Sequence, residues 1–194
     1  MKERIAMEFS RTLGMLQRMA ADESLAEMLE LVVERCASSL RAGNKLMFAG
    51  NGGSAADAQH WAGELVSRFY FDRPGLAAIA LTTDSSILTA IGNDYGYDYT
   101  FARQVEALGK SGDVLIAIST SGNSPNILRA VAAAQTLGIL IVGFSGEDGG
   151  KLASLCELCF KVPSLDTPRI QEGHEFLGHM LCSLIESAMF PDGG

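Results

Sequence analysis

The sequence is poor in basic residues and has no long apolar segment. Of its 194 residues, 15 are Lys or Arg and 23 are Asp or Glu, so the formal net charge is −8 at pH 7. Proteins that bind nucleic acid or anionic membranes over a broad surface need many Lys and Arg residues, and this composition argues against both classes of partner. No apolar run approaches the length of a membrane span or a secretory signal, so we expect a cytoplasmic protein.

Cysteine and proline are also scarce, with 4 and 5 residues. Cys156 and Cys159 form a single Cys-x-x-Cys pair, but without a second pair this spacing is a weak signal for zinc or a redox centre. We expect all the cysteines to be reduced thiols that fill apolar positions. The 47 % of hydrophobic residues is typical of a globular protein, and the length suits one domain.

Helical and strand patterns alternate after two opening helices. Apolar residues recur at helical spacing twice within residues 1–42, and these helices either cover the sheet or form a helical bundle between subunits. Short apolar runs predict five strands, at 46–49, 76–81, 114–118, 139–144 and 158–162. Between and after them we expect helices at 87–91, 101–108, 125–137, 152–155 and 169–189, with a loop at 93–96. The alternation predicts an α/β protein with a parallel sheet, in which a helical extension at 1–42 precedes a core at 43–194.

Polar turns follow the first and third predicted strands. The glycines of residues 50–53 let a ligand approach the main chain, and Ser54 is expected to cap the next helix, with Asp57 in the capping-box position. Residues 119–124 provide hydroxyls and amides at the start of a predicted helix. This composition is suited to binding a phosphate, and the alternative is a serine-rich helix cap without a ligand. Ligands of parallel sheets bind beyond the carboxyl ends of the strands, where strand order reverses, so we expect both turns at this edge. Neither turn has dinucleotide or P-loop spacing, which argues against a nucleotide.

Two helices carry side chains that could bind a metal. His60, Glu64 and Arg68 are spaced four apart and are expected to share one helix face. Gln171 and His179 lie two turns apart on the last helix, about 12 Å along its axis. A His/Glu pair that faces a Gln/His pair would provide ligands suited to zinc. The separation of Gln171 and His179 makes it difficult for both side chains to bind the same ion. A surface ion pair between His60 and Glu64 is the alternative.

Four motifs together resemble one known family. They are Ala-Gly-Asn-Gly-Gly-Ser-Ala-Ala-Asp-Ala-Gln-His-x-Ala-x-Glu at 49–64, Ile-Gly-Asn-Asp-Tyr-Gly at 91–96, Ile-Ser-Thr-Ser-Gly-Asn-Ser at 118–124 and Arg-Ile-Gln-Glu-x-His at 169–174. In combination they resemble the phosphoheptose isomerases, sugar-isomerase (SIS) domain proteins that act on sedoheptulose 7-phosphate, over essentially the whole chain. The resemblance implies a single SIS domain over 1–194, a three-layer α-β-α sandwich with a five-stranded parallel, flavodoxin-like sheet and N-terminal helices. It also implies a homotetramer with active sites at subunit interfaces.

The resemblance implies a zinc site and a sugar-phosphate site. One Zn²⁺ per subunit would be bound by His60, Glu64, Gln171 and His179. The substrate would contact Asn51, Gly52, Gly53, Glu64, Asn93, Asp94, Ser119, Thr120, Ser121, Ser124 and Gln171. Some relatives have an Asp three residues before the metal-binding Gln, whereas here that position is Pro168 and the nearest acid is Asp166.

The implied reaction converts sedoheptulose 7-phosphate to D-glycero-D-manno-heptose 7-phosphate through an enediol. This would be the first step of nucleotide-activated heptose biosynthesis, for lipopolysaccharide or another glycoconjugate. Glu64 would be the base and His179 the acid, with the ion polarising the oxygens and with Asp94 and Arg68 as hydroxyl-binding or supporting groups. A zinc-bound carboxylate is a poorer base, so Glu64 would have to leave the metal or use its second oxygen.

Two other functions are compatible with the motifs. One is a non-catalytic SIS tetramer, like the relatives that bind a bacterial replication-initiation protein. The other is an isomerase or binding domain for a different sugar phosphate. The presence of both Glu64 and His179 favours the enzyme.

Overall fold

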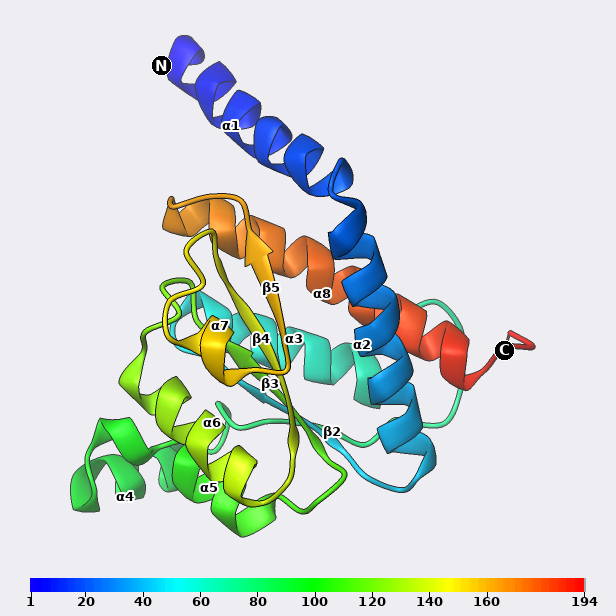
Figure 1. The fold of residues 1–194 in the computed structure, drawn as a ribbon, viewed down its shortest axis with the longest axis vertical. Helices are drawn as coiled ribbons and strands as arrows, with labels where there is room; N and C mark the ends of the chain where they lie inside the picture. Colours follow the sequence, from blue (N-terminus) through cyan, green and yellow to red (C-terminus); the bar gives the residue numbers. More distant parts are fainter. Residues whose placement is uncertain (194) are drawn as a thin grey trace.

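The computed structural model describes residues 1–193, which form a parallel sheet between two layers of helices (Figure 1). The strands are β1 (Leu46–Ala49), β2 (Ala78–Ala80), β3 (Val114–Ile118), β4 (Leu140–Gly146) and β5 (Leu158–Val162). They pair in parallel in the order β2-β1-β3-β4-β5. The order therefore reverses between β1 and β3, as in flavodoxin-like sheets.

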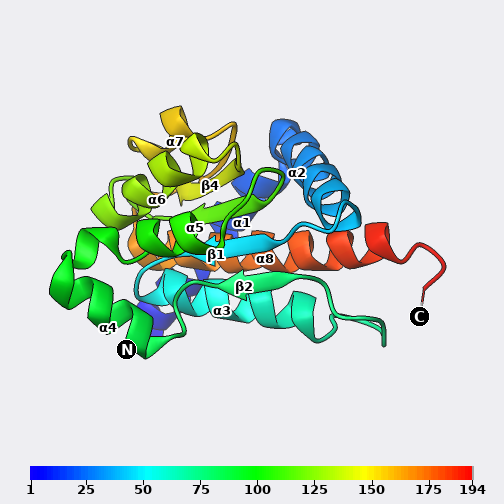
Figure 2. The ribbon, with the colours of Figure 1, turned by 90° about the horizontal axis from the view of Figure 1, so that it is seen from below.

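The helices divide between the two faces of the sheet (Figure 2). The first face is covered by α1 (Lys2–Ala20), α2 (Glu23–Arg41), α3 (Gly53–Val66) and α8 (Thr167–Met189). The second face is covered by α4 (Ser85–Asp94), α5 (Ala102–Leu108), α6 (Pro125–Thr136) and α7 (Leu152–Leu155), with a short 3₁₀ helix, η1 (Tyr97–Tyr99), between α4 and α5. The predicted three-layer α-β-α sandwich is confirmed.

Each central strand contributes to two apolar cores because successive side chains point to opposite faces. In β3, Ile116 packs with the α2, α3 and α8 side, whereas Leu115 and Ala117 pack with α5 and α6. All of β1 and β3 is buried. The strands are therefore continuous apolar runs rather than alternating ones, which is why they can be recognised in the sequence.

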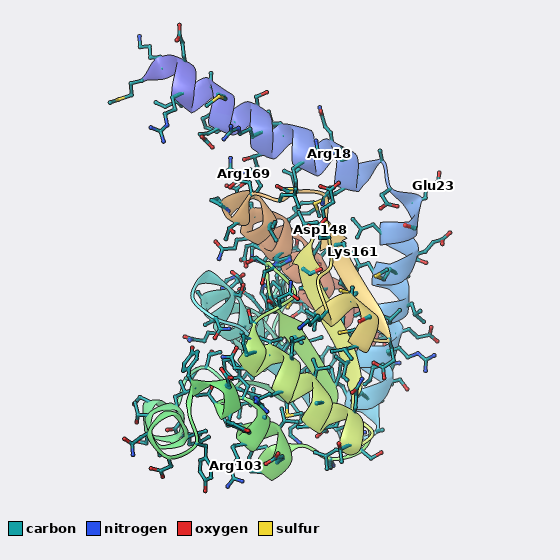
Figure 3. The ribbon with its side chains drawn as sticks, turned by 60° about the vertical axis from the view of Figure 1, so that its left-hand side comes forward. Arg18, Glu23, Arg103, Asp148, Lys161 and Arg169 are labelled. Atoms are coloured by element: carbon teal, nitrogen blue, oxygen red, sulfur yellow. The ribbon has the colours of Figure 1, made fainter. Side chains whose placement is uncertain are left out.

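The first helix extends away from the sheet and is fastened near its middle and its end (Figure 3). Arg169, at the start of α8, binds the Glu8 carboxylate at 3.0 Å, and Arg18 donates to the carbonyl of Pro163 at 2.8 Å. Phe9 and Leu13 stay 68 % and 58 % exposed. This helix therefore presents apolar side chains that the chain itself does not cover.

Several predicted boundaries are wrong. Asn93 and Asp94 are the last residues of α4 rather than part of a loop, because the helical hydrogen bonds continue to the cap, where the Tyr95 amide donates to the Ile91 carbonyl at 2.9 Å. The helix begins at Ser85, with Asp84 accepting from the Ile87 amide at 2.9 Å. The second strand is shorter than predicted and spans only 78–80.

The start and end of α3 also differ from expectation. Gly52, at a φ of +57°, turns the chain directly into the helix, so it is the N-cap and Ser54 is a buried first-turn residue. The helix ends at Val66, so Arg68 does not share the helix face of His60 and Glu64. Arg73 explains this end, because its guanidinium donates to the carbonyl groups of the last turn.

The cysteines are all free thiols, as predicted; Cys36 and Cys182 are buried and the other two are half-buried. Burial raises the pKa of Cys36 to about 12, so this thiol is unreactive at neutral pH. In the described part of the chain, no helix combines the length and the apolar character needed to cross a membrane.

Candidate active site

The candidate site lies where α3 and α8 run side by side on the first face of the sheet (Figures 1 and 2). The buried Trp61 of α3 lies directly on the backbone of α8, where a Cβ on Gly178 would overlap the indole ring. Only glycine allows this close approach. The contact brings the polar side chains of the two helices within reach of one another.

The two histidines of these helices are in contact. Nε2 of His60 lies 2.8 Å from Nε2 of His179, so one ring donates and the other accepts. Their side chains are 44 % and 45 % exposed. Two imidazoles with lone pairs or protons directed at one point, and accessible from solvent, are suited to metal binding or to proton transfer.

Glu175 completes this cluster, and sequence reasoning missed it. Its Oε1 lies 3.3 Å from Nε2 of His60 and 3.2 Å from Nε2 of His179. Its Oε2 accepts a hydrogen bond from Nε1 of Trp61 at 3.0 Å. One ligand atom from each of the two histidines and Glu175 lies within 4.8 Å of the others. The spacing of four residues from Gln171 to Glu175 to His179 was a signal that could have found it.

Glu64 and Gln171 lie at the edges of the cluster. Oε1 of Glu64 is 3.7 Å from Nε2 of His60. A hollow of about 480 Å³ lies beside it, lined by Gln59, His60, Gly63, Glu64, Ser67 and Arg68. Gln171 packs against the start of α3, where a Cβ on Gly53 would overlap its amide group. The glycine turn and the histidine pair are thus linked along the α3–α8 contact.

Asp57 adds an unpaired buried oxygen to the same region. Its Oδ2 has no hydrogen-bond partner among the described residues. Burial, and then the negative charge of Glu175, raise the pKa of Asp57 to about 6, although His60 opposes the shift. Carboxylates that lack a cationic partner next to two imidazoles form a donor set that fits a divalent cation.

The two polar turns meet at the point where strand order reverses, as predicted. Asn51, after β1, donates to Oδ1 of Asn126 at 2.9 Å, and Asn126 donates back to Oδ1 of Asn51 at 2.8 Å. Within the second turn, the hydroxyls of Ser119 and Ser124 are 2.8 Å apart. Tyr97 also donates to Oδ1 of Asn51, at 3.0 Å. These bonds fix the glycine turn to the start of α6.

Comparison with known proteins identifies the family. Residues 9–146 match the family described as SIS domain. A phosphoheptose isomerase from Aneurinibacillus thermoaerophilus is 54 % identical over 190 residues, which cover 98 % of this chain and 96 % of the relative. The chain belongs to the phosphoheptose isomerase family.

Other members of the family agree with this assignment. A phosphoheptose isomerase from Burkholderia pseudomallei is 60 % identical over 172 residues, or 89 % of this chain and 87 % of the relative. The solved structure of the phosphoheptose isomerase from Neisseria gonorrhoeae superposes with a TM-score of 0.90 at 44 % identity, over 96 % of this chain and 98 % of that one.

The structure brings together some of the residues that the family resemblance assigns to the site and leaves others apart. His60, Glu64 and His179 converge within one chain, with Gln171 one turn before Glu175 on α8. Asn93 and Asp94 are exposed at the end of α4, where the Asn93 amide donates to the Asp94 carboxylate at 2.8 Å.

Thr120 and Ser121 of the second turn border a separate cavity. It has a volume of about 280 Å³ and is also lined by Glu147 and Asp148. A phosphate inside that cavity would face two carboxylates. The side of the turn that suits an anion is therefore the start of α6, where the amides and the helix dipole favour negative charge.

Proposed function

We propose that this protein interconverts sedoheptulose 7-phosphate and D-glycero-D-manno-heptose 7-phosphate. The observation that carries the proposal is the contact of His60 with His179 next to Glu64, on the same side of the fold as two turns suited to phosphate. The names of the relatives support the substrate. The reaction would serve carbohydrate metabolism as the first step of heptose biosynthesis, for lipopolysaccharide or another glycoconjugate, in the cytoplasm.

The reaction moves a proton between C1 and C2, and the residues divide this work. Glu64 takes the proton from C1 of the ketose and returns it to C2 of the enediol. His179 donates a proton to the oxygen on C2 and removes the hydroxyl proton on C1 as the aldehyde forms. Phe69 packs edge-on against the ring of His179, and this contact holds the ring in one orientation, as general acid catalysis requires.

The phosphate end of the sugar would be held at the switch point of the sheet. We assign this role to the backbone of Gly52 and Gly53, to Asn51, and to the hydroxyls of Ser119, Thr120, Ser121 and Ser124. Asn93, Asp94 and Gln171 would bind sugar hydroxyls. No Lys or Arg lies within residues 119–124, so the anion would be held by amides, hydroxyls and the dipole of α6. This remote binding orients C1 and C2 at Glu64.

We propose one Zn²⁺ per subunit, held by side chains drawn from His60, Glu64, Gln171 and His179. The orphaned oxygen of Asp57 and the surplus of carboxylates around the two imidazoles support a cation at this position. When bound, zinc would stabilise negative charge on the substrate oxygens.

The protein is expected to work as a homotetramer, with residues 1–42 as a helical extension of the α/β core. The exposed apolar side chains of α1, Ile5, Phe9 and Leu13, and Phe176 of α8, support this expectation. Such a row of apolar groups is typical of a subunit contact.

Incubation with sedoheptulose 7-phosphate in D₂O tests the proposal. We expect the aldose to form with deuterium at C2, because an enediol exchanges its proton with solvent through Glu64. A chelator should abolish turnover and zinc should restore it, and Glu64→Gln should fold normally without turnover. Absence of aldose with and without added zinc would favour a non-catalytic SIS protein. Faster turnover of a shorter ketose phosphate would point to a different substrate.

A further inference from the structure

We infer that Glu186 and Arg73 are positioning residues for the proposed reaction. Their buried ion pair fastens the segment after α3 to α8, and so holds Phe69 against the ring of His179. The inference rests on the proposed function, in which His179 is the general acid. It extends the site to two side chains that are buried and therefore cannot touch the sugar.

The segment after α3 borders the site although it is neither helix nor strand. Residues 67–77 have no regular secondary structure. Ser67 and Arg68 line the hollow of about 480 Å³ in the candidate site. The centroid of the Phe69 ring lies 5.8 Å from that of the His179 ring, and the two planes meet at 69°. A shift of this segment would therefore change both the hollow and the surroundings of the proposed acid.

The carboxylate of Glu186 fastens this segment to α8. It is fully buried and accepts hydrogen bonds from the amide of Phe69 at 2.8 Å and from the amide of Tyr70 at 2.7 Å. Glu186 lies two turns after His179 on α8, so the two side chains share one face of the helix, about 10 Å apart along its axis. The helix that carries the acid thus also binds the backbone of the residue packed against that acid.

Arg73 folds the segment around the same carboxylate. Its Nε donates to Oε1 of Glu186 at 2.9 Å, and its side chain is only 2 % exposed. Its terminal nitrogens donate to the carbonyls of residues 64, 65, 67 and 74. The amide of Leu76 donates to the carbonyl of Leu65 at 3.0 Å, which brings the two ends of the segment together as in an Ω-loop. The planar fork of the guanidinium lets one side chain make all these contacts at once.

This network allows the segment one position. Both oxygens of Glu186 are occupied by donors, and a shift of the segment would leave a buried charge or a buried N–H without a partner, which is costly. The Tyr70 side chain is 76 % exposed and adds little to the anchoring. We therefore expect the backbone bonds to Glu186 to determine where the Phe69 ring meets His179.

A double-mutant cycle in the purified full-length protein tests the inference. Glu186→Gln keeps the shape of the side chain, but its NH₂ group cannot accept from an amide, so one backbone bond is lost. We expect kcat for sedoheptulose 7-phosphate to fall by about tenfold or more, with a change in KM of less than about threefold. Phe69→Leu should lower kcat in the same way. The double variant should match the slower single variant within about twofold, because Glu186 acts through Phe69.

Asp113→Asn is the matched control. Asp113 is also fully buried, accepts from the amides of Lys45 at 3.0 Å and Lys110 at 2.9 Å, and pairs with the Lys45 side chain. It directly precedes β3, so it lies at the opposite edge of the sheet from the polar turns. Asp113→Asn should lower the stability of the protein but leave kcat unchanged at a temperature at which every variant is folded.

Two measurements do not depend on turnover. Hydrogen exchange in a peptide that contains residues 69 and 70 should be about tenfold faster in Glu186→Gln and unchanged in Asp113→Asn. The chain has only three His, so a ¹³C–¹H spectrum of the His-labelled protein at fixed pH resolves His179, which His179→Gln assigns. Its signal should move in both Glu186→Gln and Phe69→Leu, because the ring current of Phe69 acts on it. If Glu186→Gln does not fold, Arg73→Lys, which keeps the charge but not the fork, takes its place in every measurement.

Several outcomes would overturn the inference. They are a normal kcat in folded Glu186→Gln, losses that multiply in the double variant, and a His179 signal that stays in place. An equal fall of kcat in Asp113→Asn would make the effect one of general stability. Failure of the proposed function is read separately: a parent protein that does not turn over sedoheptulose 7-phosphate, but in which Glu186→Gln loosens the segment and moves the His179 signal, would refute the reaction and leave the positioning of His179 standing.

Discussion

Replacement of Gly178 by alanine tests whether the close approach of α3 and α8 builds the site. The new methyl group would overlap the Trp61 ring, so the helices must separate or the indole must turn. Either movement breaks the hydrogen bond from Trp61 to Glu175 and separates His60 from His179.

The size of the effect follows from three contributions. Overpacking of a rigid core costs about 1–3 kcal/mol, and loss of a hydrogen bond to a charged group costs about 1.5–3 kcal/mol. Alanine in place of glycine within a helix returns about 1 kcal/mol. We therefore expect Gly178→Ala to lower the free energy of unfolding by roughly 1.5–5 kcal/mol.

Urea unfolding followed by tryptophan fluorescence measures this directly, because the chain has a single Trp and that residue is Trp61. With a slope of about 2 kcal/mol per molar urea, the midpoint should fall by about 0.8–2.5 M. The native emission should shift to longer wavelength as the indole becomes exposed. Gly63→Ala is the control, because a Cβ there meets no atom within 4 Å and should be neutral or stabilising. A Gly178→Ala protein with the parent's midpoint, emission and zinc affinity would refute the argument.

Three other predictions concern substrate binding and pH. Ser121→Ala should raise the KM for sedoheptulose 7-phosphate in steady-state kinetics by about tenfold with a smaller change in kcat, because it removes a hydrogen bond remote from the reacting carbons. A defect in kcat alone would contradict the assignment of Ser121 to phosphate binding. Burial alone would raise the pKa of Glu186, but hydrogen bonds from the amides of residues 69–70 and from Arg73 outweigh it and lower the pKa. The stability that this lowered pKa provides is complete above the unfolded value of 4.5 and is lost as the pH falls below it. Glu186→Gln should therefore cost about 3 kcal/mol at pH 7 and progressively less as the pH falls below 4.5, which urea unfolding over a pH series measures. Burial lowers the pKa of His174 to about 4, so the neutral His174 stabilises the fold fully above pH 6.5, and the free energy of unfolding should decline between pH 6.5 and 4. His174→Gln should remove that part of the pH dependence in the same titration. An unchanged slope in this window would contradict the prediction.

Local sequence patterns identify the strands, the polar turns that follow the first and third of them, and the family. Buried parallel strands such as Val114–Ile118 are short continuous apolar runs, and the glycine and serine turns that follow them are local signals, so both can be read without coordinates. The positions of His60 and His179 were also found, because their residue types and helical spacing are local properties.

How α3 and α8 meet depends on tertiary packing. Contact between residues more than a hundred positions apart depends on the packing of Trp61 against Gly178, which no periodicity specifies. That packing brings Glu175 to the two imidazoles, and Arg73, by binding the last carbonyls of α3, ends the helix before Arg68. Local patterns thus identify most of the polar side chains of the site. The packing of two helices that are distant in sequence determines which of these side chains lie in contact.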